Sequence, residues 1–211
     1  GPVPVSASML PLKAWADVLH ERQTVRRFRP DAIPLPLVER LVSAATRAPS
    51  AHNRQPWRFC VLREKAGKVA LAEAMGRRLR ADRERDGDAA EAIAADVRRS
   101  HERITGAPLA VLVCLTLQDM DAYPDERRAT SEWLMAVQST AMAGENLLLA
   151  AQAEGLGACW MCAPLFCPDE VREALKLPAG WTPQGLILVG YPAEAGKFRQ
   201  RLPLGSVMIQ R

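Results

Sequence analysis

Hydrophobic positions along the chain repeat at two spacings, one typical of helices and one typical of strands. Apolar residues recur at i, i+3, i+4 and i+7 in residues 12–22, and again from Pro34 to about Ala48. The second helix must end there, because Pro49 disfavours helical geometry in the residue before it. Helices are also predicted over residues 65–85, 88–104, 129–154 and 168–175.

Strands are predicted where apolar residues alternate with polar ones or form a short continuous run. Residues 57–62 alternate, whereas 109–117 are almost all apolar, which is typical of a central strand buried on both faces. Further strands are predicted over 158–162 and 184–191, and an extended segment over 207–209. Because the chain contains no internal repeat, low-complexity segment or linker, we expect one domain of mixed helix and sheet over residues 1–211.

Composition and charge narrow the classes of function. The 28 basic and 24 acidic side chains give a net charge of +4, which suits an anionic ligand such as a phosphate but is too small and dispersed for nucleic-acid binding. No apolar stretch approaches the roughly 18 residues of a membrane span, and the N-terminus lacks the pattern of a signal peptide, so we expect a cytoplasmic protein. Five cysteines are an odd number for a disulfide framework, and three widely separated histidines offer no metal site.

Two basic clusters could bind a phosphate. In an extended chain Arg22, Thr24 and Arg26 point the same way, so two guanidinium groups and a hydroxyl converge. Guanidinium groups bind phosphate in a bidentate manner, and a hydroxyl adds a further donor. Positions 197, 199 and 201 of the segment Lys197–Arg201 share one face in the same way. Either cluster alone is also typical of a solvated surface, and the tail would have to fold back for the two to meet.

The loop over residues 49–56 offers hydroxyl and amide groups between two prolines. Ser50, Asn53 and Gln55 can each donate and accept hydrogen bonds, as the imide edge of a planar heterocycle requires. The same residue types also favour an ordinary turn between a helix and a strand.

Four motifs, taken together and in this order, resemble the nitroreductase family. They are Arg22-x-Thr24-x-Arg26-x-Phe28, Ala48-Pro49-Ser50-Ala51-x-Asn53-x-Gln55-Pro56-Trp57, Gly155-Leu156-Gly157-Ala158-Cys159-Trp160 and Arg199-x-Arg201-Leu202-Pro203. The resemblance extends from about residue 14 to the end of the chain. The polar helices over 65–104, which end in Arg99-Ser100-x-x-Arg103-Ile104, look most like the branch related to the C-terminal reductase domain of enzymes that mature a deazaflavin coenzyme.

This resemblance implies an α+β fold with a central mixed or antiparallel sheet flanked by helices. Two subunits would intertwine as a homodimer and build two FMN sites at their interface. Residues 1–10 would form a flexible N-terminal segment, and residues 196–211 a C-terminal arm.

The family's pattern also implies which residues hold the phosphate end of FMN. Arg22, Gln23 and Thr24 would bind the phosphate and the ribityl chain, and Arg199 and Arg201 would close on the phosphate. Arg26 would lie at the pyrimidine edge of the flavin, where a cation stabilises the negative charge of the reduced state.

Two further segments complete the implied site. Pro49, Ser50, Asn53 and Gln55 of the partner subunit would contact the flavin. The backbone of Met161, Cys162 and Ala163 would run beside the hydride-accepting nitrogen and offer hydrogen bonds.

The implied activity is ping-pong hydride transfer through FMN. The donor would be NAD(P)H or a reduced deazaflavin, and the acceptor a nitro group, a quinone or an activated alkene. No catalytic side chain is required, because the cofactor carries the chemistry and the protein supplies position and charge. Two alternatives remain open: a module that binds a flavin or a deazaflavin-type coenzyme without turnover, and a protein that binds neither.

The pair Cys159-x-x-Cys162 is either a redox dithiol or a structural pair. It falls on a predicted strand and not at the start of a helix, where the pKa of a thiol would be lowered, and this favours the structural pair. Trp160, between the two cysteines, is the one aromatic residue that we consider for stacking on the flavin.

Overall fold

The computed structural model describes residues 12–211, whereas residues 1–11, which include the predicted N-terminal segment 1–10, lie outside the described residues. The helices are α1 Leu12–Glu21, α2 Leu35–Ala45, α3 Lys65–Arg85, α4 Ala90–Gly106, α5 Glu126–Ala153 and α6 Pro168–Leu175. The strands are β1 Trp57–Leu62, β2 Leu109–Leu115, β3 Gly157–Met161 and β4 Thr182–Gly190. Short 3-10 helices span Ala51–Asn53, Ala163–Phe166 and Leu204–Ser206.

The four strands form one antiparallel sheet in the order β1-β2-β4-β3. In its centre Val111 of β2 pairs with Ile187 of β4. At the outer edge of β3, Thr24 and Ala158 form an isolated bridge, which is the one parallel pairing in residues 12–211. The predicted α+β fold, with an antiparallel sheet flanked by helices, is confirmed.

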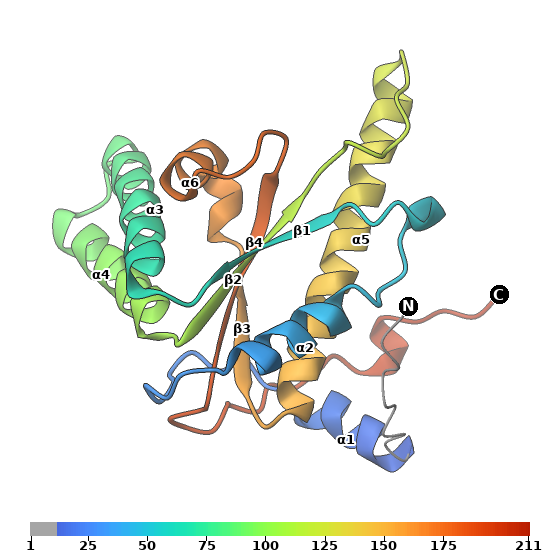
Figure 1. The fold of residues 1–211 in the computed structure, drawn as a ribbon, viewed down its shortest axis with the longest axis horizontal. Coiled ribbons are helices and arrows are strands. Elements are labelled where there is room, and N and C mark those ends of the chain that lie inside the picture. Colours follow the sequence, from blue (N-terminus) through green and yellow to red (C-terminus); the bar gives the residue numbers. More distant parts are fainter. Residues whose placement is uncertain (1–11) are drawn as a thin grey trace.

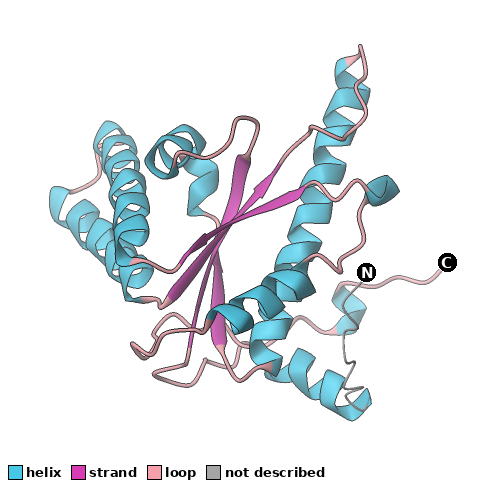
Figure 2. Ribbon diagram, in the orientation of Figure 1, coloured by secondary structure: helices cyan, strands magenta, loops and turns pink. Residues whose placement is uncertain are grey.

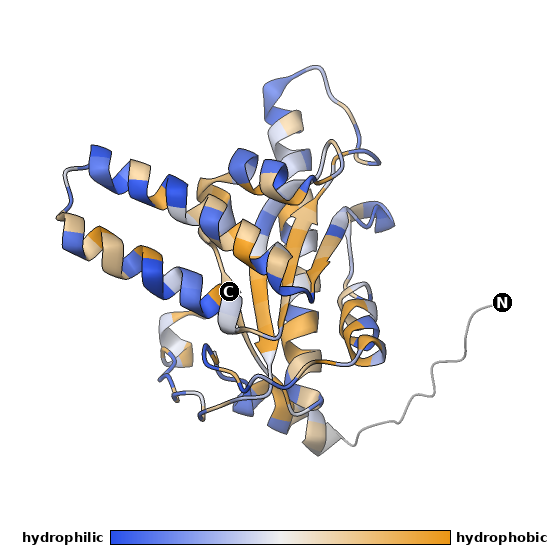
Figure 3. Cartoon of the chain, turned by 60° about the vertical axis from the view of Figure 1, so that its left-hand side comes forward, coloured by the Kyte–Doolittle hydropathy of each residue, from blue (hydrophilic) through white to orange (hydrophobic). Residues whose placement is uncertain are grey.

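Helices cover both faces of the sheet (Figures 1 and 2). α2 and α5 pack on one face, against a core that includes Val111 and Val113. α3 and α6 pack on the other, against Leu112 and Cys114. All of β2 is fully buried, so the predicted central strand is confirmed. Figure 3 shows the hydrophobic sheet at the centre and the largely hydrophilic α3 and α4 at the periphery.

Ion pairs hold the hairpin of α3 and α4 together. The hairpin turns at Gly87, whose φ of 80° suits glycine. Arg83 of α3 donates to Asp88 at 2.6 Å and also pairs with Asp96 of α4. Arg78, also on α3, pairs with Asp82 of its own helix and with Glu170 of α6, each at 2.9 Å. Arg78 and Arg83 are therefore each matched by two carboxylates.

Several predicted boundaries differ from the observed ones by one to three residues, and two of these differences have a local cause. α2 ends at Ala45 and not at about Ala48, because the next three residues form a turn and a bend. α5 begins three residues earlier than predicted, because the Asp125 carboxylate accepts a hydrogen bond from Arg128 N at 2.9 Å and caps the helix. The predicted extended segment 207–209 pairs with no strand of the described chain, and its side chains are exposed.

The Trp160 indole fills a space between α5 and β4 that two glycines leave open. A Cβ atom on Gly144 of α5 would lie 2.5 Å from Cζ3 of Trp160, and one on Gly185 of β4 would lie 2.2 Å from Cζ2. The indole packs beside Ala143 and Ile187, on the face of the sheet that α5 covers. The side chain therefore points away from α3, α4 and α6.

Replacing Gly144 with alanine should destabilise the protein, although alanine favours a helix. The added methyl group overlaps the indole ring, and overpacking of this kind costs about 1–3 kcal/mol. Urea denaturation measures the effect as a lower transition midpoint. Gly106→Ala is the matched control, because it also lies in a helix and no atom lies within 4 Å of its added Cβ. Equal midpoints for the two variants would contradict this packing.

Candidate functional site

The segment after α1 is held in an extended conformation at the edge of the sheet. Val25 N donates to Ala158 O of β3 at 3.0 Å, and the Val25 side chain is buried. Gly157 permits this approach, because a Cβ atom there would lie 2.8 Å from Cβ of Val25. With Val25 directed into the core, the neighbouring side chains of Thr24 and Arg26 are exposed, as the alternation of an extended chain requires.

The chain that leaves β4 returns along this segment. Ala193 N donates to Arg27 O at 3.0 Å. Gly196 then passes so close to Gln23 that a Cβ atom on the glycine would lie 2.4 Å from Cβ of Gln23. Figure 1 shows the two segments side by side at the lower end of the sheet. The tail therefore folds back onto the first basic cluster, which the sequence alone did not show.

Both basic clusters and helix α4 line one cavity of about 990 Å³. This volume is at the upper end of the range for small-molecule sites. Nine of the lining side chains are cationic and two are carboxylates. The cations are Arg22, Arg26, Arg27, Arg98, Arg99, Arg103, Lys197, Arg199 and Arg201, and the carboxylates are Glu102 and Glu194. A cavity with this balance of charge attracts anions.

Only two of the nine cations have a carboxylate partner within the described chain. Arg27 lies 3.9 Å from Glu194, with both side chains largely exposed, and Arg99 lies 3.2 Å from Asp96. The other seven form no ion pair and no side-chain hydrogen bond with a residue of the range 12–211. Their mutual repulsion would be relieved by an anionic ligand.

Arg103 of α4 shows the effect of this concentration of charge. Its pKa lies below the usual value, first because burial removes water from the guanidinium group and then because Arg26 and Arg99 are nearby cations. Arginine nevertheless stays protonated. The charge on α4 is therefore coupled to that of Arg26, a residue of the first motif.

Helix α4 forms a wall of the cavity that the sequence did not predict as part of the site. The wall follows helical spacing through Ala95, Arg98, Arg99, Glu102, Arg103 and Gly106. Ile93 and Ile104, on the same helix, are buried. A polar stripe is visible in the sequence, but such a stripe usually faces water, and only the path of the chain places this one against a cavity.

The predicted residues Met161, Cys162 and Ala163 do not line this cavity. Met161 ends β3 and, like Ala163, packs against the core on the side of α3 and α6, while Cys162 is exposed. Ile104 of α4 belongs to the same core. The cavity and the end of β3 therefore lie on the same side of the sheet.

The alternation along β3 decides between the roles considered for its side chains. Trp160 faces α5, away from the cavity, so the structure does not support stacking of its indole on a ligand held there. Cys159 faces the opposite side and is buried, and burial raises the pKa of its thiol. A buried thiol of this kind is a poor nucleophile, which favours the structural interpretation of the cysteine pair.

The loop over residues 49–56 lies apart from the cavity in this chain. Pro49, Ser50, Asn53 and Gln55 are absent from its lining. The Ser50 hydroxyl accepts a hydrogen bond from Gln55 N at 3.0 Å, and the Ala51 N–H donates to Ser139 of α5. The loop is bent sharply, with positive φ values at His52, Asn53 and Gln55. Asn53 and Gln55 are exposed. Gln55 Nε2 donates to Asn53 O at 3.4 Å, and the other amide groups of the two side chains have no partner in the described chain.

The described chain offers few other kinds of site. Over residues 12–211 no three histidine, cysteine or acidic side chains gather where they could hold a metal ion. None of the helices α1 to α6 is both long and apolar enough to cross a membrane. All five cysteines are free thiols.

Comparisons with known proteins agree on one family. The sequence model of the Nitroreductase family matches residues 19–191. A protein of Thermus thermophilus named NADH dehydrogenase is 34% identical over 215 residues, which cover 90% of this chain and 93% of that protein. A 5,6-dimethylbenzimidazole synthase of Rhodospirillum rubrum is 32% identical over 186 residues, covering 82% and 79%. A nitroreductase of Desulfovibrio desulfuricans, solved in complex with FMN, shares the fold with a TM-score of 0.71 at 24% identity, covering 93% and 96%.

Replacing Gly196 with alanine should weaken anion binding, because the added Cβ pushes the tail away from Gln23. Inorganic phosphate should raise the melting temperature of the parent protein, since a ligand of the folded state stabilises it. We expect an apparent Kd for phosphate about threefold or more higher in the variant, a cost of roughly 0.7 kcal/mol. Gly205→Ala, in the same tail but with no atom within 4 Å of its Cβ, should bind as the parent does. Equal Kd values for Gly196→Ala and the parent would show that the tail is not part of the anion site.

Proposed function

The chain belongs to the nitroreductase family of oxidoreductases, and on that premise we propose that it binds FMN and transfers hydride from NAD(P)H to a nitro, quinone or activated-alkene acceptor. The observation that carries the proposal is the single cavity that both basic motifs line. Two segments from opposite ends of the chain meet there, and most of their cations have no partner within residues 12–211.

The residues of the cavity fit the phosphate of FMN. Arg22 and Arg201 supply guanidinium groups, whose planar forks match phosphate oxygens, and the Thr24 hydroxyl supplies a further donor. Gln23 and Arg199 line the same cavity and complete the proposed phosphate and ribityl contacts. A phosphate carries nearly two negative charges at neutral pH, so it would offset part of the repulsion among these cations.

The flavin ring is proposed to extend from this phosphate site toward the end of β3. Arg26, which also lines the cavity, would lie at the pyrimidine edge and place a positive charge there. The backbone of Met161, Cys162 and Ala163 would run beside the reacting edge. Their position on the cavity side of the sheet supports this direction.

FMN, when bound, supplies the hydride-accepting and hydride-donating chemistry. The protein would then contribute position and charge: α4 and the motif residues hold the ligands in one place, and Arg26 stabilises negative charge on the reduced ring. Because the cofactor would carry the chemistry, no side-chain acid or base is assigned to the reaction.

We also propose that the working unit is a homodimer. The C-terminal arm exposes apolar side chains, including Phe198 at 81% and Ile209 at 73%, and α5 exposes Leu134 and Met142. Apolar surface of this extent on a folded chain is typical of a protein interface. Two-fold pairing would also give the exposed amides of Asn53 and Gln55 a surface to meet, namely the flavin held by the other subunit.

A deazaflavin-type coenzyme is the alternative partner of this cavity. The arginine-lined face of α4 supports it, because this face belongs to the polar helices that suggested the deazaflavin branch. On this alternative the protein would take hydride from the reduced coenzyme in place of NAD(P)H, transfer hydride to the oxidised coenzyme as its acceptor, or bind it without turnover.

The purified protein, with FMN added, should show the yellow absorbance of a bound flavin, and anaerobic NADPH or NADH should bleach it. Arg22→Ala/Arg201→Ala should bind FMN at least about 100-fold more weakly, since hydrogen bonds to charged groups contribute about 1.5–3 kcal/mol each and two such groups are removed. Fluorescence titration measures this, with Arg80→Ala of α3 as a control outside the cavity.

The outcomes of this experiment separate the alternatives. Bands that bleach only with a reduced deazaflavin would select the alternative donor, and bands that persist with every donor would indicate a binding module. No bound flavin at any FMN concentration would overturn the proposal.

Hybrid dimers should show that each site uses two chains. One chain carries Arg22→Ala/Arg201→Ala and the other Asn53→Gly/Gln55→Gly, in which glycine removes the amides and suits the positive φ. A hybrid isolated through two affinity tags would keep one intact site of two, so it should bind about half as much FMN as the parent. If each site were formed within one chain, both sites of the hybrid would be damaged. The FMN content would then fall to that of a homodimer of either double variant.

A further inference from the structure

We infer that Arg98, Arg99 and Arg103 of α4 form a second anion subsite, which binds a phosphate or carboxylate of the substrate that exchanges electrons with FMN. The inference rests on the proposed function, because it assigns the cofactor's own phosphate to the two motif clusters. It assigns the choice of substrate to residues of α4, a helix that contains none of the four family motifs.

Pairing within the α3–α4 hairpin distinguishes these arginines from their neighbours. Arg78 donates to Asp82 at 2.9 Å and to Glu170 at 2.9 Å, and Arg83 donates to Asp88 and pairs with Asp96. The carboxylates hold the pKa of both guanidinium groups above the usual value.

Arg98 and Arg103, by contrast, have no carboxylate partner in the described chain, although their hairpin is rich in acidic residues. Arg99 pairs only with Asp96, which Arg83 already shares. Arg78 and Arg83 are thus held by carboxylates, whereas Arg98 and Arg103 line the cavity without one.

The amount of charge exceeds what one cofactor phosphate requires. A phosphate monoester carries nearly two negative charges, whereas the cavity holds nine cations against two carboxylates. A large positive excess therefore remains after FMN binds. The cavity volume of about 990 Å³ also leaves room for a second ligand beside the cofactor.

The charge of Arg103 on α4 interacts with that of Arg26, in the part of the site where a substrate would approach the flavin. Arg103 experiences the charge of Arg26, which we place at the pyrimidine edge of the flavin. An anionic group bound by Arg103 would thus lie on a substrate near the flavin ring. A guanidinium group that is partly buried binds such an anion more strongly than one in open water.

Two substrates could carry this anionic group, and paired compounds distinguish them. NADPH differs from NADH only by a phosphate, which tests the donor. 4-Nitrobenzoate differs from 4-nitrobenzamide by a carboxylate in place of a neutral amide, which tests the acceptor. The ratio of kcat/KM within each pair isolates the contribution of the anion.

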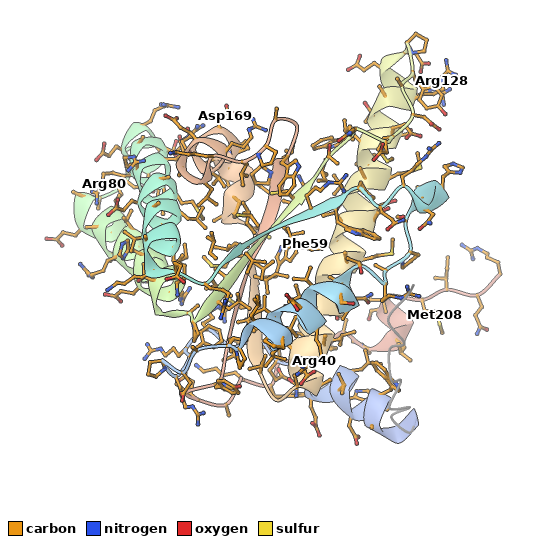
Figure 4. The ribbon with its side chains drawn as sticks, in the orientation of Figure 1. Arg40, Phe59, Arg80, Arg128, Asp169 and Met208 are labelled. Carbon is orange, nitrogen blue, oxygen red and sulfur yellow. The ribbon has the colours of Figure 1, made fainter. Side chains whose placement is uncertain are left out.

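The experiment uses the FMN-loaded protein and compares the parent with Arg98→Gln/Arg103→Gln. In one of the two pairs the parent should prefer the anionic member at least tenfold, and the double variant should lose most of that preference. Arg103→Lys should retain a larger part of it, and it serves as well if the double variant does not fold. Arg80→Gln, on the same hairpin but outside the cavity lining, should behave as the parent does (Figure 4).

A binding measurement tests the subsite without turnover. Adenosine 2′,5′-bisphosphate should raise the melting temperature of the FMN-loaded parent more than adenosine 5′-monophosphate does, and 4-nitrobenzoate more than 4-nitrobenzamide, in whichever pair carries the preference. The double variant should lose this difference. The effect should weaken as NaCl is added, because salt screens exposed charges.

The results that would overturn the inference are distinct from failure of the proposed function. Absence of anion preference in both pairs for the parent, or a preference that the double variant keeps, would overturn it while FMN turnover remained. Loss of bound FMN in the double variant would assign these arginines to the cofactor and overturn it as well. A parent protein that binds no FMN would instead refute the proposed function.

Discussion

Repulsion among like charges is the constraint that the site imposes on the rest of the structure. Seven cations without a partner in residues 12–211 surround one cavity, and Arg103 is partly buried among them. Backbone hydrogen bonds and the buried central sheet oppose this repulsion. Val25 is bonded to β3, Ala193 is bonded to Arg27, and the central strand β2 is buried along its whole length. These contacts hold the backbone of the first motif beside β3, so an anionic ligand is the direct means of lowering the remaining repulsion among the side chains.

Small residues let the segments of the site come close enough for this arrangement. Gly157 lies against Val25, and Gly196 lies against Gln23, so the two motif segments that line the cavity both depend on a missing side chain. Neither position has a positive φ, so the requirement is for space and not for a special backbone conformation. Gly185 has the same function on the opposite face, where it admits the Trp160 indole. The fold thus uses glycine to bring the two ends of the chain together at one edge of the sheet.

The sequence predicts the helices and strands of this fold well, because hydrophobic periodicity and the prolines and glycines that end helices determine them. The limits of β1, α3 and α6 agree with the predicted ranges, and the fully apolar run of β2 identifies the central strand. Boundaries shift where a local contact extends an element, as the Asp125 cap does for α5.

The site is harder to predict, because it depends on how distant segments meet. Alternation placed Arg22, Thr24 and Arg26 on one side of the chain, but the return of Gly196 to Gln23 is a long-range contact with no local signal. For the same reason the sequence does not distinguish the arginines of α4 from a solvated stripe. It also does not show that Trp160 lies on the α5 side of the sheet, away from the cavity where stacking on a flavin would occur.

In the proposed function, the C-terminal arm would link cofactor binding to assembly through the alternation of its side chains. Lys197, Arg199 and Arg201 line the cavity, whereas Phe198 between them is 81% exposed. In an extended chain successive side chains point in opposite directions, so one arm presents cations to a ligand and an apolar side chain to whatever lies outside. Beyond Arg201, exposed Leu202, Leu204 and Ile209 continue the apolar surface, and Figure 4 shows Met208 far from the α3–α4 hairpin. If the proposed dimer covers this surface, pairing of the subunits would order the same segment that is proposed to bind the cofactor phosphate. Each process then lowers the entropic cost of the other, so cofactor affinity and dimer stability should rise and fall together.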